Sequence, residues 1–177
     1  GQRSPRGYFV SAGYLCAGLA VLTALYVISL RPVERQKRSM AIAEHALRTG
    51  QVGKARTMLQ QAADADRWSP DAILWLADHY RGRIVLQSAA PANRQQWDAS
   101  LREAKLRGGH DPAVYRMIGI QQLHVSHRHG DPADLAAAAD TFGDAVAWSP
   151  SNVWMLAQMA VIADAQDNAE QAQELGN

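Results

Sequence analysis

Hydrophobic residues fill the beginning of the chain without interruption. Residues 8–30, YFVSAGYLCAGLAVLTALYVISL, contain no charged side chain, and about 20 apolar residues are enough for a helix to cross a bilayer. Tyr8 and Tyr26 lie toward the ends of this stretch, where aromatic rings favour the headgroup layer. The pattern predicts a transmembrane helix over 8–30, behind a basic flank over 1–7. A buried core helix is the alternative, and a signal peptide fits less well because no cleavage site with small residues follows.

From residue 39 onward, apolar residues recur at spacings of three and four. This spacing is the period of amphipathic helices, whereas strands show alternation. Typical faces are Ala55, Leu59 and Ala62; Ile73, Leu76 and Tyr80; and Leu135, Ala138 and Phe142. The pattern predicts an all-α repeat domain over 39–175 with about four helix pairs, the last helix being a short one over 168–175. A basic juxtamembrane segment over 31–38 joins this domain to the transmembrane helix.

Four dipeptides are typical of helix starts. In each of them a Ser or Asp can cap the free N–H groups, and the proline that follows suits the first helical turn. They are Ser69-Pro70, Asp111-Pro112, Asp131-Pro132 and Ser149-Pro150. Pro70, Pro112 and Pro150 recur at a nearly constant interval. A period of roughly 40 residues indicates an array of helical repeats.

One phrase occurs twice in the chain. Residues 64–77 read DADRWSPDAILWLA, and residues 144–157 read DAVAWSPSNVWMLA. We interpret Trp68 and Trp148 as residues that close the second helix of a pair and pack their indoles in the turn. The alternative is a pair of tryptophans that contact a ligand.

The small residues and prolines resemble those of tetratricopeptide repeats (TPR). Ala138, Phe142, Ala145 and Pro150 follow one another at intervals of four, three and five, which is the run of small, large, small and proline residues in that family. Gly50, Ala55, Leu59 and Ala62 match its front half. The chain departs from the family in three ways. Its period is longer than the usual one of about 34 residues, RGRIVLQSAAPANRQ (81–95) is inserted between paired helices, and the first helices lack a Leu-Gly dipeptide.

The resemblance implies an α-solenoid that binds peptides or partner proteins on a surface lined by the first helix of each pair. His79, Tyr115 and Arg116 lie on predicted first helices and are candidate lining residues. Arg81 and Arg83 stand at the start of the inserted segment and are candidates for the same surface. With Arg94, Arg102, Lys105 and Arg107 they could receive an acidic peptide or a phosphate, although such charges more often face water.

Charge and composition narrow the functional classes. The segment 1–38 holds six basic side chains and a single acidic one, so acidic side chains outnumber basic ones in the repeat domain that follows. This mildly acidic domain is not expected to bind nucleic acid. Cys16 is the single cysteine of the chain, so no intrachain disulfide can form.

No catalytic, cofactor-binding or metal-binding residue is predicted. His124, His127 and His129 could hold a metal only if a further ligand approached, and a solvated helix end is the favoured interpretation, since histidines there complement the helix dipole. Phosphate-binding loops and nucleophile motifs are missing from the sequence. The chain is therefore expected to be non-enzymatic.

The favoured hypothesis is a membrane-anchored scaffold that contacts lipid through residues 8–30 and proteins through its repeats. The basic residues after the apolar stretch favour a cytoplasmic repeat domain. A second hypothesis rests on a resemblance of residues 8 to about 80 to the tails of O-antigen ligase/polymerase-like membrane glycosyltransferases, and the missing initiator Met favours it. A third is an accessory subunit of a large membrane complex. The sequence leaves open the partner, the membrane, the oligomeric state and whether the chain is part of a polytopic protein.

Overall fold

Helices make up nearly all of the regular structure. The computed structural model describes residues 5–86 and 90–176, with side chains over 14–86 and 90–167. The elements are α1 (Pro5–Leu25), the π-helical turn η1 (Tyr26–Leu30), α2 (Arg31–Arg48), α3 (Val52–Ala65), α4 (Asp71–Leu86), α5 (Pro91–Gly108), α6 (Pro112–His129), α7 (Pro132–Trp148) and α8 (Val153–Gly176). No strand occurs in the described ranges. The predicted all-α fold class is confirmed.

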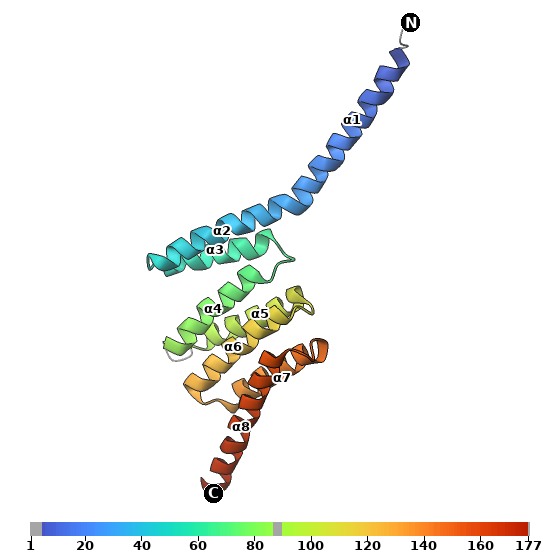
Figure 1. The fold of residues 1–177 in the computed structure, drawn as a ribbon. Helices are drawn as coiled ribbons and strands as arrows, with labels where there is room; N and C mark the ends of the chain where they lie inside the picture. Colours follow the sequence, from blue (N-terminus) through green and yellow to red (C-terminus); the bar gives the residue numbers. More distant parts are fainter. Residues whose placement is uncertain (1–4, 87–89, 177) are drawn as a thin grey trace.

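The helices stack in sequence order, as Figure 1 shows. α2 pairs with α3, α4 with α5 and α6 with α7, while α8 packs on α7. α4 also contacts α6, so the first helices of these two pairs lie next to each other. This is the predicted repeat arrangement. The prediction of a separate short helix over 168–175 is wrong. α8 runs without a break from Val153 to Gly176, because no glycine or proline interrupts it before its last residue.

Three of the four predicted helix starts are confirmed. The carboxylate Oδ1 atoms of Asp111 and Asp131 each accept a hydrogen bond from the N–H two residues later, at 2.9 Å. The hydroxyl of Ser69 accepts from the N–H of Asp71 at 3.3 Å. These caps satisfy N–H groups that have no partner within the helix.

The start predicted at Ser149-Pro150 is wrong. There the N–H of Asn152 donates to the carbonyl of Ser149 at 3.0 Å and closes a turn. α8 begins at Val153, and Oδ1 of Asn152 accepts from the N–H of Met155 at 3.3 Å. Asn152 therefore takes the capping role that was expected of the serine.

The predicted insertion over 81–95 is also wrong for most of its length. α4 continues to Leu86 and α5 begins at Pro91, so only 87–90 connect them, and 87–89 lie outside the described residues. α4 and α5 are 16 and 18 residues long. The long period of this unit is therefore accommodated by its helices and not by a loop.

Small residues let the paired helices approach closely. Ala138, Phe142 and Ala145 of the TPR-like run are 0% exposed, as are Ala55 and Leu59. Burying a large apolar side chain contributes about 1.5–3 kcal/mol, and an alanine beside it brings the neighbouring backbone within reach.

Gly119 of α6 supplies the closest approach in this core. A Cβ atom built on Gly119 would lie 2.7 Å from Cε1 of Phe142 and closer still to its Cζ. The phenyl ring of α7 thus rests directly on the backbone of α6. The first helices have no Leu-Gly dipeptide, but Ile118-Gly119 of α6 supplies the small residue that such a dipeptide would provide.

Three buried or half-buried polar contacts join the units. The side-chain carbonyl of Gln121 accepts from the indole N–H of Trp97 at 3.2 Å, and its amide donates to the carbonyl of Leu74 at 3.3 Å. Arg94 forms a two-pronged ion pair with Asp134, which is 1% exposed; the Nη1–Oδ2 distance is 2.9 Å. These contacts connect α4, α5, α6 and α7, so the repeats are held by specific polar contacts as well as by apolar packing.

The two copies of the repeated phrase have different surroundings. Trp148 is 42% exposed but packs on its neighbours as predicted, with ring centres 4.2 Å from His110 and 4.8 Å from Tyr115. Trp68 does not, because its side chain is 89% exposed. The prediction that both indoles pack in the turn is therefore wrong for Trp68.

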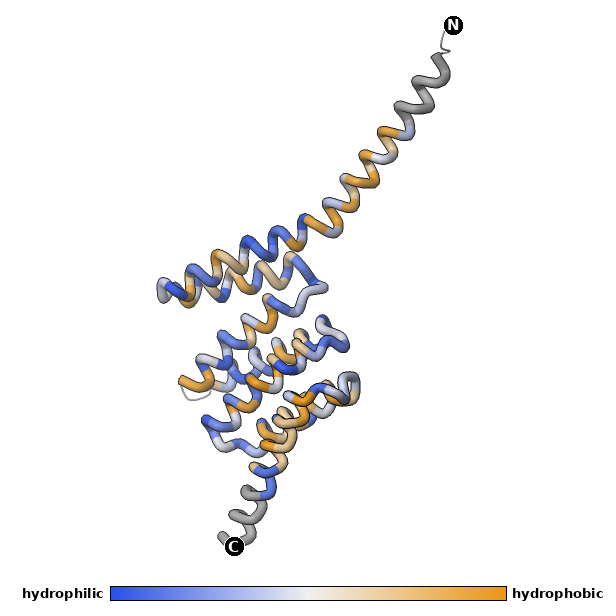
Figure 2. The backbone as a smooth tube through the Cα atoms, viewed as in Figure 1, coloured by the Kyte–Doolittle hydropathy of each residue, from blue (hydrophilic) through white to orange (hydrophobic). Residues whose placement is uncertain are grey.

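α1, η1 and α2 form one uninterrupted helix, and its α1 part projects from the stack (Figure 2). Proline has no N–H, and its ring crowds the carbonyl four residues earlier, so Pro32 disturbs the helix near Ile28. There the N–H of Arg31 donates to the carbonyl of Tyr26, five residues back. The helix changes direction at this π-helical turn (Figure 1).

Apolar side chains cover the projecting part of this helix. All residues over 14–31 are exposed. By length and composition, Tyr14–Arg48 is the one helix of the described residues that could cross a membrane. No residue in the most apolar part of this helix is buried. The body of the protein therefore gives this segment no apolar cover.

Candidate partner-binding groove

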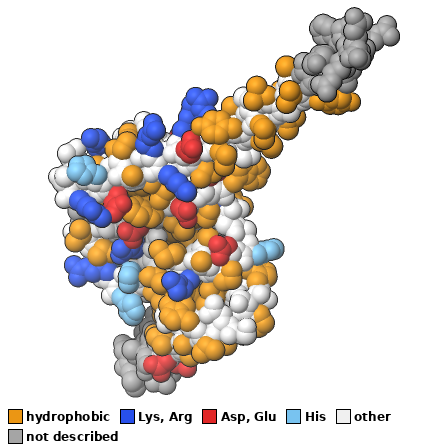
Figure 3. Space-filling view, turned by 45° about the horizontal axis from the view of Figure 1, so that its top comes forward, with side chains coloured by type: hydrophobic (Ala, Val, Ile, Leu, Met, Phe, Trp, Pro, Cys, Tyr) orange, Lys and Arg blue, Asp and Glu red, His pale blue; other side chains and the backbone are white. Residues whose placement is uncertain are grey.

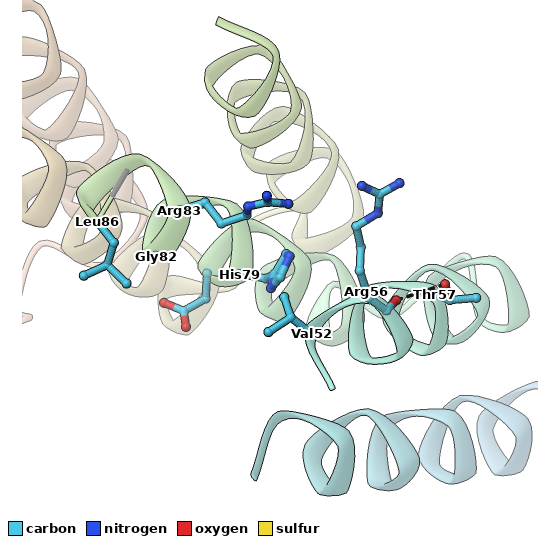
Figure 4. Close-up of a pocket in the computed structure, with 9 residues that line it drawn as sticks. Val52, Arg56, Thr57, His79, Gly82, Arg83 and Leu86 are labelled. Atoms are coloured by element: carbon cyan, nitrogen blue, oxygen red, sulfur yellow. Dashed lines mark hydrogen bonds between the residues drawn. The ribbon is translucent and has the colours of Figure 1, made fainter. Parts of the chain in front are cut away.

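A groove of about 750 Å³ lies between α3 and α4. It is formed by the first half of α3 and the second half of α4 (Figure 4). Its lining residues are Val52, Gly53, Arg56, Thr57, Asp78, His79, Gly82, Arg83 and Leu86. A Cβ atom built on Gly53 or Gly82 would meet nothing within 4 Å. The two glycines therefore leave open space between the facing helices.

Positive charge dominates the groove. Arg56 from α3 and Arg83 from α4 both line it, and neither has an ion-pair partner among the described side chains. The carboxylate of Asp78 accepts two hydrogen bonds from Arg81, at 2.7 and 2.9 Å, and is thereby neutralised. An acidic group entering the groove would meet two arginines whose charge is not otherwise balanced.

His79 lies between these arginines in the lining (Figure 4). Its Nε2 atom is buried and has no hydrogen-bond partner among the described residues. Burial, followed by the positive charges of Arg83 and Arg56, lowers the pKa of His79 from its ordinary value of 6.5. A neutral ring with an unsatisfied buried nitrogen is a group to which a ligand can supply a hydrogen bond.

His79 is expected to make the protein less stable in mild acid. Because its pKa is lowered in the folded state, the unfolded chain binds more protons once the pH falls below about 6.5. The free energy of unfolding should therefore fall as the pH decreases through this range, and level off below the pKa of the folded state. Thermal unfolding of the wild type and of His79→Gln at pH 7.5 and 5.5 checks this. An equal loss of stability in both proteins would assign the effect to other groups.

The structure brings two of the five predicted partner-binding residues into the groove, namely His79 and Arg83. Arg81 lies on the same helix but pairs with Asp78. Arg116 is exposed on α6, where its guanidinium carbon lies 5.4 Å from the centre of the Trp154 ring. Arg116 is not among the groove residues, so its role stays a prediction.

Tyr115 is not a surface residue, contrary to the prediction. It is 5% exposed, its ring packs against Trp148, and the ammonium of Lys105 lies 5.1 Å from the ring centre. Burial raises the pKa of its hydroxyl. The periodicity placed Tyr115 on a first helix, but the side chain points into the core of the last unit.

The larger basic cluster expected around 81–107 does not form one binding surface. Arg94 pairs with Asp134, Lys105 with Asp144 at 2.7 Å, and Arg107 with Glu103 at 2.9 Å. Arg102 is exposed. Most of these charges therefore stabilise contacts within the protein.

The histidines at the end of α6 remain separate from the groove. His124, His127 and His129 are all exposed in the last turns of this helix. Among the described residues, no group of three His, Cys, Asp or Glu side chains could hold a metal ion. Cys16 is exposed on the projecting helix.

Arg56 is the functional candidate that sequence reasoning missed. It is exposed on α3, one turn after Val52 and beside the buried stripe that contains Ala55 and Leu59. Its exposure could be inferred from the apolar spacing. However, the residues of α3 were predicted to form the second helix of a pair, and the resemblance places only first helices on the binding surface.

The fold and the helix pairing define a TPR-like helical-repeat domain. Among solved structures, the chain is similar to the TPR domain of OM64 from Arabidopsis, with a TM-score of 0.51 and 14% sequence identity. The match covers 76% of this chain and 98% of that domain. No protein-family model matches the chain, and no curated protein matches its sequence. At this identity the similarity shows the fold alone.

Proposed function

We propose that the chain is a membrane-anchored, non-catalytic scaffold that binds an acidic segment of a partner protein in the groove between α3 and α4. The observation that carries the proposal is the pair of unneutralised arginines, Arg56 and Arg83, beside the unsatisfied nitrogen of His79. The TPR-like fold supports it, since stacked helical repeats form extended binding surfaces. No cofactor is needed for this function.

The groove suits a peptide better than a small ion. It is open, about 750 Å³ in volume, and its lining includes the exposed apolar side chains of Val52 and Leu86. An extended segment with a carboxylate at its centre and apolar residues on either side would match both features. Charge-assisted hydrogen bonds to arginine would fix its register.

Site-specific crosslinking in native membranes tests the groove. A photoreactive phenylalanine analogue replaces Val52 in the full chain, and the double substitution Arg56→Glu, Arg83→Glu is added to it. We expect a protein adduct at position 52 that the double substitution abolishes, because like charges then repel an acidic partner. Arg102→Glu, which reverses an exposed charge outside the groove, should leave the adduct unchanged. An adduct that survives the double substitution would contradict the proposal.

The membrane anchor is proposed for residues 8–30. The described part of this stretch is apolar and wholly exposed, with Leu15 at 75%, Leu19 at 67% and Leu22 at 65%. Figure 3 shows apolar side chains along the projecting helix, whereas charged side chains lie over the body. Such a surface is stable in the hydrocarbon of a bilayer but costly in water.

Charged residues in this helix should release the protein from membranes. Leu19→Arg with Leu22→Arg is expected to weaken insertion by about 2.5–3.5 kcal/mol per residue. The variant should be extracted by alkaline carbonate, whereas the wild type and Leu106→Arg, on an exposed position of α5, stay in the pellet. Retention of the double variant would show that residues 8–30 are not the anchor.

The topology follows from the charges beside the anchor. Arg31, Arg35 and Lys37 lie at the start of α2, and basic residues favour the cytoplasmic side, so we propose that the repeats are cytoplasmic. The same uninterrupted helix would also suit the last span of an O-antigen ligase/polymerase-like protein or a subunit wedged into a larger complex. The mass of the native protein separates the longer parent from the free chain, and co-purification in mild detergent identifies a complex.

A further inference from the structure

Trp68 is a large apolar side chain with almost no contact to the protein. It is 89% exposed, in the turn between α3 and α4. Leaving an indole in water forgoes most of the stabilisation that its burial would give. Trp68 is not isolated, because the exposed side chain of Ile28 lines the same surface pocket, and adjoining exposed apolar side chains are typical of an interaction surface.

The turn that carries Trp68 is firmly held. The carboxylate of Asp66 accepts a hydrogen bond from the N–H of Trp68 at 3.0 Å. Arg107 of α5 is half-buried and donates to the carbonyls of Ala63 and Asp66, at 2.8 and 3.1 Å. The exposure of the indole is therefore a property of a fixed turn.

This turn lies beside the point where the apolar helix meets the body. Ile28, Ser29 and Pro32 line the same surface pocket as Arg67 and Trp68. Figure 1 shows the turn between α3 and α4 on the side of the stack from which α1 projects. Trp68 is thus adjacent to the end of the segment that we propose to span the membrane.

We infer that Trp68 inserts into the headgroup layer of the bilayer and forms a second contact of the repeat domain with lipid. The inference rests on the proposed membrane anchor. The headgroup region adds several ångströms beyond the hydrocarbon on each side, and the amphipathic indole ring prefers this region. Arg67, next to it and exposed, can face lipid phosphates. Two contacts, the helix and the indole, restrict the tilt of the repeat domain against the membrane.

A fluorescent probe at three positions tests the inference in the full chain. The probe, an environment-sensitive NBD group, is attached to the natural Cys16, or to Trp68→Cys or Val161→Cys in a Cys16→Ala background. The proteins are reconstituted in vesicles of phosphatidylcholine and phosphatidylglycerol that carry a nitroxide either on the headgroup or deep in the acyl chain. Val161 is an exposed apolar position of α8, at the other end of the stack (Figure 1).

We expect headgroup nitroxides to quench the probe at position 68 and to leave the probe at position 161 unchanged. The probe at 68 should also emit at a shorter wavelength than the probe at 161. The probe at Cys16 should be quenched by acyl-chain nitroxides. If Cys16 is quenched and position 68 behaves like position 161, the inference is overturned while the anchor stands. If Cys16 is not quenched, the anchor itself fails. Equal headgroup quenching at 68 and 161 would indicate general adsorption and would also overturn the inference.

Discussion

Replacing Arg94 with alanine is expected to lower the free energy of unfolding by about 3–5 kcal/mol, because it leaves a buried carboxylate without its partner. Asp134 is 1% exposed, whereas the side chain of Arg94 is 33% exposed. The reverse substitution, Asp134→Ala, should therefore destabilise less, since Arg94 can turn toward water. Urea unfolding of the full chain in mild detergent, followed by circular dichroism, measures both.

A double-mutant cycle separates the ion pair from other contributions of Arg94. The guanidinium also lies 4.9 Å from the centre of the Trp97 ring, a contact that Asp134→Ala leaves in place. The double variant should lose less than the sum of the single variants. Arg48→Ala, which breaks an exposed ion pair with Glu44, is the control and should cost about 1 kcal/mol or less. Additive losses at Arg94 and Asp134 would contradict the pairing.

The second large effect is expected at Gly119. In Gly119→Ala the new methyl group would overlap the buried ring of Phe142, and overpacking of this kind costs about 1–3 kcal/mol. Leucine at the same position should prevent α6 and α7 from pairing. Thermal unfolding of the full chain measures the effect.

Gly143 provides a matched control for this prediction. It follows Phe142 directly on α7, and a Cβ atom there would meet nothing within 4 Å. Gly143→Ala should therefore be neutral or stabilise by up to about 1 kcal/mol, through helix propensity alone. A similar loss at both glycines would show that the contact between Gly119 and Phe142 is not the cause.

Local patterns predicted most of the helices. Asp111-Pro112 and Asp131-Pro132 carry a cap and a proline directly beside the backbone groups that they serve, so a short sequence window contains the whole interaction. Ala138, Phe142 and Ala145 were identified in the same way, because their spacing alone places them on one face.

The different surroundings of Trp68 and Trp148 depend on residues that lie far from them in the chain. Trp148 packs on Tyr115 of α6, whereas the residue that stands the same number of positions before Trp68 is Arg35. The exposed, charged side chain of Arg35 on α2 offers the indole no aromatic surface. The same three letters therefore give a half-exposed indole that packs on aromatic neighbours in one unit and an almost wholly exposed indole in the other.

The candidate groove was predicted only in part for a related reason. His79 was found because the resemblance pointed to first helices, and Arg83 because it stands at the start of the expected inserted segment. Arg56 belongs to a second helix and faces them across the junction of two units. Tyr115 was misplaced because periodicity does not tell which of two apolar stripes meets the next repeat. Contacts between units require the stacking geometry, which a single sequence does not contain.

The uninterrupted helix from α1 to α2 fixes the direction in which the repeat domain faces around the axis of α1. No flexible linker separates the apolar segment from the first unit, so each residue inserted after Leu30 would rotate the groove by about 100° around the helix axis and raise it by about 1.5 Å. If residues 8–30 span the membrane as we propose, an insertion of one residue would point the arginines toward a different neighbour in the plane of the membrane. An insertion of a whole turn would nearly restore their direction. With the proposed anchor in place, the rotational position of the helix at the membrane surface would determine which membrane neighbour the groove can reach.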